Sequence, residues 1–145
     1  MVLQYHGIPA IDEVVFKETY GTGSNTVTEG LNAHLAANNK TVRYSILDTG
    51  GYSESQYRQT LIACVQNGNP VIVMILKTAL GGTLPYASES GHYVVFTGLY
   101  FDNTAGTYMA VINDLHHTYP GRYIMPFSEL YSYSMNHSGY IIRAN

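Results

Sequence analysis

Gly91-His92-Tyr93-Val94-Val95-Phe96-Thr97-Gly98 is the beginning of a long apolar stretch, which a polar turn at residues 102–106 separates from Met109-Ala110-Val111-Ile112-Asn113-Asp114. Two apolar runs joined by a short polar turn that contains glycine predict a β-hairpin. Pairing about this turn places residue 92 opposite residue 116, and residue 114 opposite residue 94. The first strand then has a histidine at its start, and the second ends in an aspartate.

His92 and Asp114 can therefore meet. Opposed or diagonal side chains of an antiparallel pair share one face, about 4.5 to 8 Å apart. The carboxylate can accept from one imidazole nitrogen and leave the other free, which is the arrangement that a general base needs. We predict that His92 and Asp114 are catalytic and that their neighbours Gly91 and Tyr93 bind substrate; Gly91 would also let another backbone approach closely. Alternatively, His92 is an ordinary histidine at a strand start and Asp114 caps a loop.

The segment from Gly91 to Asp114 resembles the second half of papain-like cysteine peptidases of the bacteriocin-processing type, peptidase family C-thirty-nine and its relatives. The resemblance extends to the opening Met1-Val2-Leu3-Gln4-Tyr5-His6-Gly7, to Asn69-Pro70-Val71-Ile72-Val73, and to two closing segments, 127–130 and 139–142. It implies a papain-like fold and a peptide or protein substrate. It also implies that His92 is the base and that Asp114 orients it.

The resemblance also implies a residue that is missing here. In such peptidases the nucleophilic cysteine opens the first helix in a Cys-Gly-Pro-Ala-like segment, with an oxyanion-hole glutamine shortly before it. The present sequence begins at Met1, in what corresponds to the later part of that helix, which Gly7 ends. We therefore expect a single peptidase-like domain over residues 1–145 that is truncated at its N-terminus.

The chain has one cysteine, Cys64. Ser53-Glu54-Ser55-Gln56 forms a capping box, and Tyr57, Leu61, Cys64 and Val65 follow at helical spacing. A cysteine on the apolar stripe of a helix behaves as a small hydrophobic residue whose thiol pKa is raised. We predict that Cys64 is buried, inert and far from His92.

Composition excludes several classes of function. Seven basic and ten acidic residues give a net charge of -3, and the scattered cations form no patch for nucleic acid or an anionic membrane. We find no signal peptide and no membrane span in this sequence, and we predict no cofactor. Its 14 tyrosines and few lysines suggest an extracellular or cell-surface bacterial domain.

The remaining pattern predicts an α+β layout, with a helical first half packed on an antiparallel β-sheet. We expect helices at about 10–20, with Val14, Val15 and Phe16 facing inward, at about 28–38 after a capping box at residues 26–29, and at 54–67. Strands are predicted at 41–47 and 71–77 and in the hairpin. A short helix after Pro126 and a last strand at 139–143 complete the fold.

Two further features bear on function. The loop at residues 78–90 runs directly into His92 and is a candidate substrate-binding lip, or else a flexible connector. His116 and His117 could join His92 and Asp114 around a zinc ion. Adjacent residues of an extended segment point in opposite directions, so the spacing argues against a metal, and none is predicted.

Two functions therefore remain open. The domain is part of a cysteine peptidase whose thiolate attacks the peptide carbonyl while His92 transfers the proton and Asp114 fixes the imidazole tautomer. Alternatively, it is a catalytically inactive relative that binds peptides without cleaving them.

Overall fold

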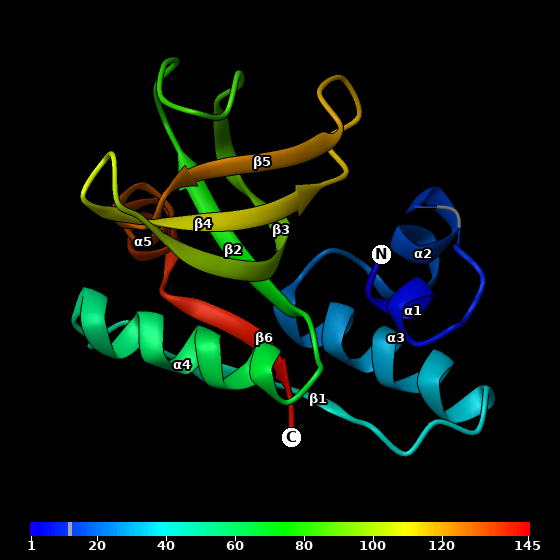
Figure 1. Cartoon of the computed structure of the whole chain (residues 1–145). Helices are drawn as coiled ribbons and strands as arrows, with labels where there is room; N and C mark the ends of the chain where they lie inside the picture. Colours follow the sequence, from blue (N-terminus) through cyan, green and yellow to red (C-terminus); the bar gives the residue numbers. More distant parts are fainter. Residues whose placement is uncertain (12) are drawn as a thin grey trace.

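The fold of the protein is α+β, as predicted from the sequence. The computed structural model describes residues 1–11 and 13–145. The helices in these residues are α1 (Val2–Tyr5), α2 (Glu13–Tyr20), α3 (Ser24–Ala37), α4 (Glu54–Gln66) and α5 (Phe127–His137). The strands are β1 (Tyr44–Asp48), β2 (Val71–Lys77), β3 (Ser88–Asp102), β4 (Thr107–Asp114), β5 (Gly121–Pro126) and β6 (Tyr140–Ala144). Figure 1 shows α1, α2 and α3 grouped together, apart from α4 and α5.

The strands form a six-stranded antiparallel sheet in the order β1-β6-β2-β3-β4-β5. Alternate residues of the central strands enter two different cores. In β2, Val71, Val73 and Ile75 belong to one core, whereas Ile72 belongs to the other. This alternation follows from the two-residue repeat of a strand, and it explains why the sequence of β2 is apolar on both faces.

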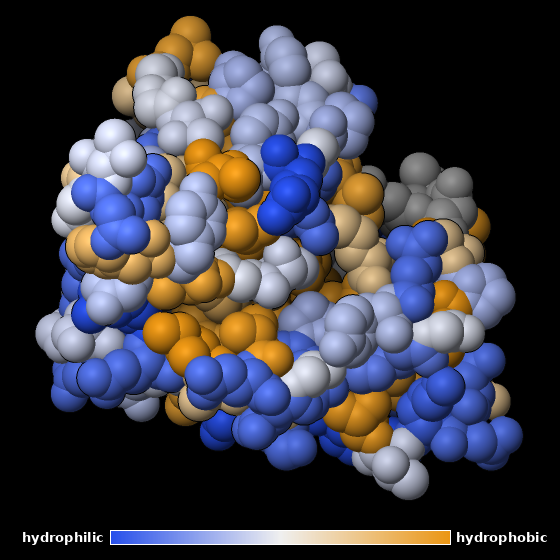
Figure 2. Space-filling view, in the orientation of Figure 1, coloured by the Kyte–Doolittle hydropathy of each residue, from blue (hydrophilic) through white to orange (hydrophobic). Residues whose placement is uncertain are grey.

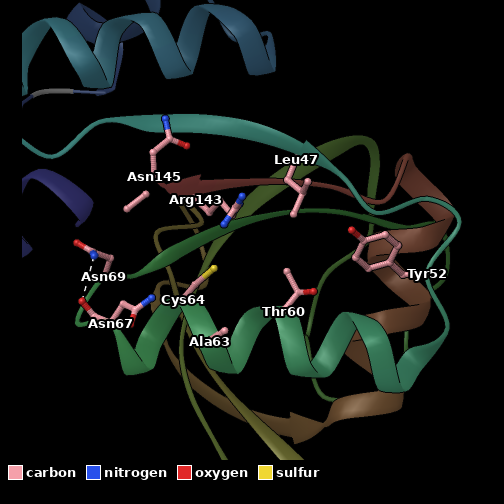
Figure 3. Close-up of a pocket in the computed structure, with 10 residues that line it drawn as sticks. Leu47, Tyr52, Thr60, Ala63, Cys64, Asn67, Asn69, Arg143 and Asn145 are labelled. Carbon is pink, nitrogen blue, oxygen red and sulfur yellow. Dashed lines mark hydrogen bonds between the residues drawn. The ribbon is translucent and has the colours of Figure 1, made fainter.

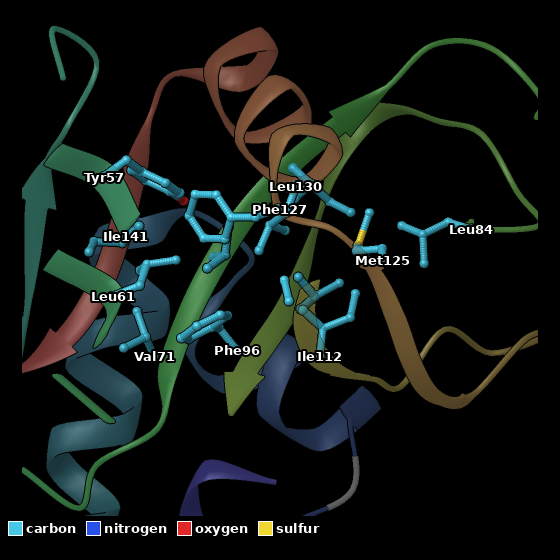
Figure 4. Close-up of a cluster of buried hydrophobic side chains, with 14 of the residues drawn as sticks. Tyr57, Leu61, Val71, Leu84, Phe96, Ile112, Met125, Phe127, Leu130 and Ile141 are labelled. Atoms are coloured by element: carbon cyan, nitrogen blue, oxygen red, sulfur yellow. The ribbon is translucent and has the colours of Figure 1, made fainter. Parts of the chain in front are cut away.

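The first core lies between the sheet and the helices α4 and α5. Tyr57 and Leu61 of α4 meet Phe127 and Leu130 of α5 there, all four fully buried (Figure 4). The hydroxyl of Tyr57 donates a hydrogen bond of 2.9 Å to Ser134, so its burial leaves no polar atom unpaired. This core supports the sheet face on which His92 lies.

The second core joins α1 and α3 to the other sheet face. Leu31 and Leu35 of α3 pack there with Val2 and Leu3 of α1. The Asn32 amide bonds both the N–H and the C=O of Tyr44, each at 2.8 Å. This bridge ties α3 to the start of β1.

Most helix predictions are confirmed, and the differences have local causes. The Ser53–Gln56 capping box is present, and Gly7, with φ +74°, follows α1. The capping box predicted at residues 26–29 is wrong. Extended Gly23 is the N-cap of α3, and the Thr26 hydroxyl bonds back to the Gly23 carbonyl instead of capping.

The predicted inward face of α2 is corrected at one position. Val15 is 54% exposed, so it does not face inward, whereas Phe16 lies against Tyr20 and His34. The part of this prediction that concerns Val14 lies outside the described side chains, and the predicted helix start near residue 10 precedes the observed one at Glu13.

The strand predictions are corrected at three points. The strand expected at 41–47 spans Tyr44–Asp48, and the Asn32 amide binds the main-chain groups of its first residue, Tyr44. β5 is missing from the predicted layout; it is an edge strand that ends in Pro126, a residue that strands tolerate at edges. β3 begins at Ser88, so the loop predicted at 78–90 is shorter.

The outer surface of the β4 and β5 region is partly apolar. Ile124 of β5 is 42% exposed, and apolar residues reach the surface over β4 and β5 in Figure 2. Within residues 1–11 and 13–145, every helix is too short or too polar to cross a membrane.

Candidate active site

The β3–β4 hairpin places His92 and Asp114 on the same face of the sheet. Val95 pairs with Asn113, so the register continues to residue 94 opposite 114 and to residue 92 opposite 116, as predicted. Val94 and Phe96 lie in the core beneath α4 and α5. His92 shares their face because side chains alternate along a strand.

A β-bulge in β3 determines that face. Asp102 pairs with Thr107 next to the turn, and the register then shifts by one residue between Phe96 and Gly98. Beyond the bulge it is Leu99 that packs on the first core. Without the extra residue, strict alternation from Leu99 would turn His92 to the opposite face.

The two side chains form a short hydrogen bond. Nε2 of His92 lies 2.6 Å from Oδ1 of Asp114. The aspartate side chain is fully buried, whereas the imidazole is 23% exposed. Within the described part of the chain, the imidazole is bonded through Nε2, and Nδ1 has no hydrogen-bond partner, so the second nitrogen of the partly exposed ring is open to a reacting group.

Tyr86 is the third member of this cluster, and sequence reasoning missed it. Its side chain is buried, and its hydroxyl donates to Oδ2 of Asp114. Its ring meets the His92 ring edge to face, with centroids 5.5 Å apart. The residue lies in a loop without periodicity, 28 positions before its partner, so no local pattern indicates the contact.

The buried carboxylate is stabilised as an anion. Burial by itself would raise the pKa of Asp114, but hydrogen bonds from His92 and Tyr86, the charge of His92 and a backbone N–H together hold that pKa below its ordinary value. The N–H belongs to His116 and lies 2.8 Å from Oδ1. Burial, reinforced by Asp114, raises the pKa of Tyr86, so the tyrosine remains a donor.

His116 and His117 take part in aromatic contacts. The His116 ring stacks on Tyr86 at 4.1 Å and on His117 at 4.5 Å. Nδ1 of His116 accepts hydrogen bonds from two following backbone N–H groups. In the part of the chain that the structure describes, no group of three or more His, Cys, Asp or Glu side chains could hold a metal ion.

Gly91 and Tyr93 lie beside His92 in different surroundings. Gly91 has φ +89°, and a Cβ there would lie 2.6 Å from Nε2 of His137. The close approach is therefore that of a side chain and not, as predicted, of another backbone. Tyr93 faces the second core, and its hydroxyl donates to the carbonyl of Thr22 at 2.9 Å. Its ring thus lies on the sheet face opposite to His92.

The loop from residue 78 to residue 87 is attached to the fold along its length. Leu84 and Tyr86 are buried, and the backbone N–H of Thr83 donates to Oε1 of Glu129 at 2.8 Å. The ammonium of Lys77 bonds carbonyls at both ends of the loop. These attachments favour the structured lip over the flexible connector.

Cys64 is buried, as predicted, at a separate place on the same sheet face. With Arg143 and Asn145 it lines a cavity of about 410 Å³ (Figure 3). Burial raises the pKa of the thiol, and Arg143 offsets this effect in part. The raised pKa favours the neutral thiol, which is not a nucleophile.

Strand register separates this thiol from His92. The pairing of β6 with β2 continues to Arg143 opposite Val71, which pairs with Phe96. From Phe96, His92 lies four residues further along β3, a distance of about 13 Å. Arg143 lies two strands away from β3, a distance of about 9.5 Å across the sheet. The imidazole therefore cannot reach Cys64 in this fold.

The comparisons with known proteins give one match. Residues 1–137 match the Peptidase_C39 like family. No curated protein and no solved structure matches the chain. The family match covers nearly the whole sequence, including the hairpin with His92 and Asp114, and the chain belongs to the Peptidase_C39 like family.

Proposed function

We propose that this domain hydrolyses peptide bonds as part of a cysteine peptidase, with His92 as general base and Asp114 as the residue that orients it. The observation that carries the proposal is the 2.6 Å hydrogen bond from His92 to a buried carboxylate, with the second imidazole nitrogen left open. Membership of a peptidase family supports a peptide substrate.

The chemistry follows from this geometry. Nδ1 of His92 accepts the proton of a cysteine thiol, and the thiolate attacks the peptide carbonyl. The tetrahedral intermediate collapses when the imidazolium returns the proton to the leaving amine. Water then hydrolyses the thioester with His92 again as base, which regenerates the thiol. Asp114 holds the Nε2–H tautomer throughout.

In this proposal the attacking thiol comes from a cysteine N-terminal to Met1. Two observations support that choice: the register keeps Cys64 away from His92, and the opening residues resemble the later part of the family's cysteine-bearing helix. Gly91, directly before the base, is the proposed substrate contact; the part predicted for Tyr93 is not carried into the proposal, because its ring lies on the opposite face of the sheet.

The second candidate function is peptide binding without cleavage. The placement of Cys64 favours it, because a chain whose thiol lies outside the reach of His92 would keep the site and lose the reaction. Both functions use the same surface around His92, and they differ in whether a thiol faces Nδ1.

The test compares the 145-residue chain with a form extended by whatever residues the gene encodes in frame before Met1. We expect the extended form to cleave peptides from an unbiased peptide library, and iodoacetamide and His92→Ala to stop the reaction. Both forms should bind the same peptides. A stop codon directly before Met1, or cleavage at the wild-type rate in His92→Ala, would refute the peptidase; peptide binding without turnover would support the binding module.

A further inference from the structure

Lys77 is the least expected side chain near the site. It is the last residue of β2, it is 2% exposed, and a buried ammonium is costly unless polar groups surround it. Its described hydrogen-bond acceptors are two backbone carbonyls, Ala79 at 2.6 Å and Tyr86 at 2.7 Å. The burial of this charge therefore depends on the position of the loop that carries both carbonyls.

The two carbonyls lie at opposite ends of that loop. Ala79 is near its start and Tyr86 near its end, so one ammonium closes the segment between them. Tyr86 is thereby held twice. The Lys77 ammonium donates to the backbone carbonyl of Tyr86, and the side-chain hydroxyl of Tyr86 donates to Asp114.

The hydroxyl of Tyr86 fixes the orientation of the carboxylate. It occupies Oδ2 of Asp114, while Oδ1 accepts from His92 and from the backbone N–H of His116. A carboxylate with both oxygens engaged cannot rotate without breaking hydrogen bonds in a buried place. Loss of the tyrosine hydroxyl would free Oδ2 and loosen the partner of the imidazole.

We propose that Lys77 is a positioning residue that acts through the backbone of Tyr86 to hold the Tyr86 hydroxyl on Asp114, and so keeps His92 oriented. Its importance for catalysis depends on the function proposed above. Its effect on Asp114 does not, and can be measured in a chain that cleaves nothing.

The surroundings of Asp114 distinguish this indirect effect from a direct one. The pKa of Asp114 reflects burial, His92 from β3, Tyr86 from the loop, and the His116 N–H after β4. In the described residues the Lys77 ammonium bonds the carbonyls of Ala79 and Tyr86 and makes no ion pair with Asp114. A direct electrostatic effect and an effect through Tyr86 therefore predict different results for a double variant.

The experiment is a carboxyl ¹³C NMR titration of Asp114 in the 145-residue chain. In Tyr86→Phe, loss of a donor to the charged form should raise the pKa of Asp114 by about one unit. Lys77→Met should raise it in the same direction, and Lys77→Met/Tyr86→Phe should show no more than the shift of Tyr86→Phe alone.

A matched control changes the same loop at another attachment. Thr83→Val removes the hydroxyl that donates to Glu129 at 3.0 Å and leaves Lys77 and Tyr86 unchanged. We expect it to leave the Asp114 titration at the wild-type position. If Lys77→Met does not fold, Lys77→Gln, which keeps an N–H donor, should give a smaller shift.

Two results would overturn the proposal. The first is that folded Lys77 variants titrate like the wild type at Asp114, and the second is that the two single shifts add up in the double variant. Either result would leave the proposed peptidase function untouched, because the readout needs no substrate. Conversely, a chain without peptidase activity that shows the non-additive shift would support the positioning role alone.

Discussion

His92 of β3 and Cys64 of α4 lie on the same side of the sheet, and their surroundings are opposite in character. His92 is partly exposed and hydrogen-bonded to a carboxylate that accepts from three donors. Cys64 is 7% exposed and shares its cavity with Arg143, whose buried Nε has no hydrogen-bond partner in the described residues.

The difference is visible in the direction of the two pKa shifts. Burial opposes charge at both places, yet the pKa of Asp114 lies below its ordinary value and that of Cys64 above it. Three hydrogen bonds converge on the aspartate, whereas a single guanidinium acts on the thiol. Of these two buried acids, the one on which several donors converge is favoured as an anion, and the other is favoured as a neutral thiol.

Removing the base should produce the largest effect. In the N-terminally extended form, we expect His92→Ala and Asp114→Asn to lower kcat/KM by about 10²- to 10⁴-fold, since a positioned general base contributes roughly that much. Initial rates on a cleaved peptide, with each variant checked for folding by circular dichroism, measure the loss.

Cys64→Ser is the matched control, because it changes the buried thiol and leaves His92 and Asp114 in place. It should keep kcat/KM within about twofold of the wild type, because a hydroxyl at that place alters neither His92 nor Asp114. Loss of turnover in folded Cys64→Ser, with activity retained in His92→Ala, would mean that Cys64 is catalytic and that His92 is not.

The backbone before His92 should be the next most sensitive point. Gly91 and Gly106 both have positive φ, but a Cβ meets the His137 ring at Gly91 and nothing within 4 Å at Gly106. Gly106→Ala should therefore cost about 1 to 2 kcal/mol of unfolding free energy from backbone strain. Gly91→Ala should cost about 1 to 3 kcal/mol more, from overpacking.

Urea unfolding of the two glycine variants measures this difference, with the midpoint and slope recorded for each. Equal losses in both would mean that the His137 ring moves aside freely. In that case the positive φ alone would explain the glycine before His92.

The sequence predicts the register of the hairpin at His92, although not the turn length and the β-bulge that produce this register. The sequence predicts a five-residue turn, with residue 92 opposite 116; the structure has Asp102 paired with Thr107 and a bulge near Thr97. The shorter turn shifts the register by one residue and the bulge shifts it back. A bulge depends on packing on both strand faces, which apolar periodicity does not encode.

The parts of the site that the sequence did not predict are long-range contacts. His92 and Asp114 could be found because a turn of known geometry joins their strands. Tyr86 and Lys77 act through a loop whose path depends on Leu84 and Glu129, and no periodic pattern describes it. β5 was missed because its apolar face is short and its last residue is proline.

The third prediction concerns pH. Asp114 has a lowered pKa in the folded chain, so its contribution to stability is full above the ordinary value of 3.8 and is lost as the pH falls through the lower folded value. The unfolding free energy of the wild type should therefore decrease as the pH falls below about 4. Asp114→Asn should show a flatter profile in this range, by urea unfolding at each pH. Parallel profiles would mean that the carboxylate is not stabilised by its donors.

The smallest effect is expected at Cys64. Its thiol is buried and its pKa is raised, so iodoacetamide at pH 8 should modify it in the native chain at least about 10-fold more slowly than in urea. Mass spectrometry after timed quenching measures both rates. Cys64→Ser should lower the unfolding free energy by about 1 kcal/mol, since a hydroxyl replaces a small apolar group in a partly polar cavity. Rapid native alkylation that slows in His92→Ala would instead require the thiol and the imidazole to meet, which the strand register of this fold forbids.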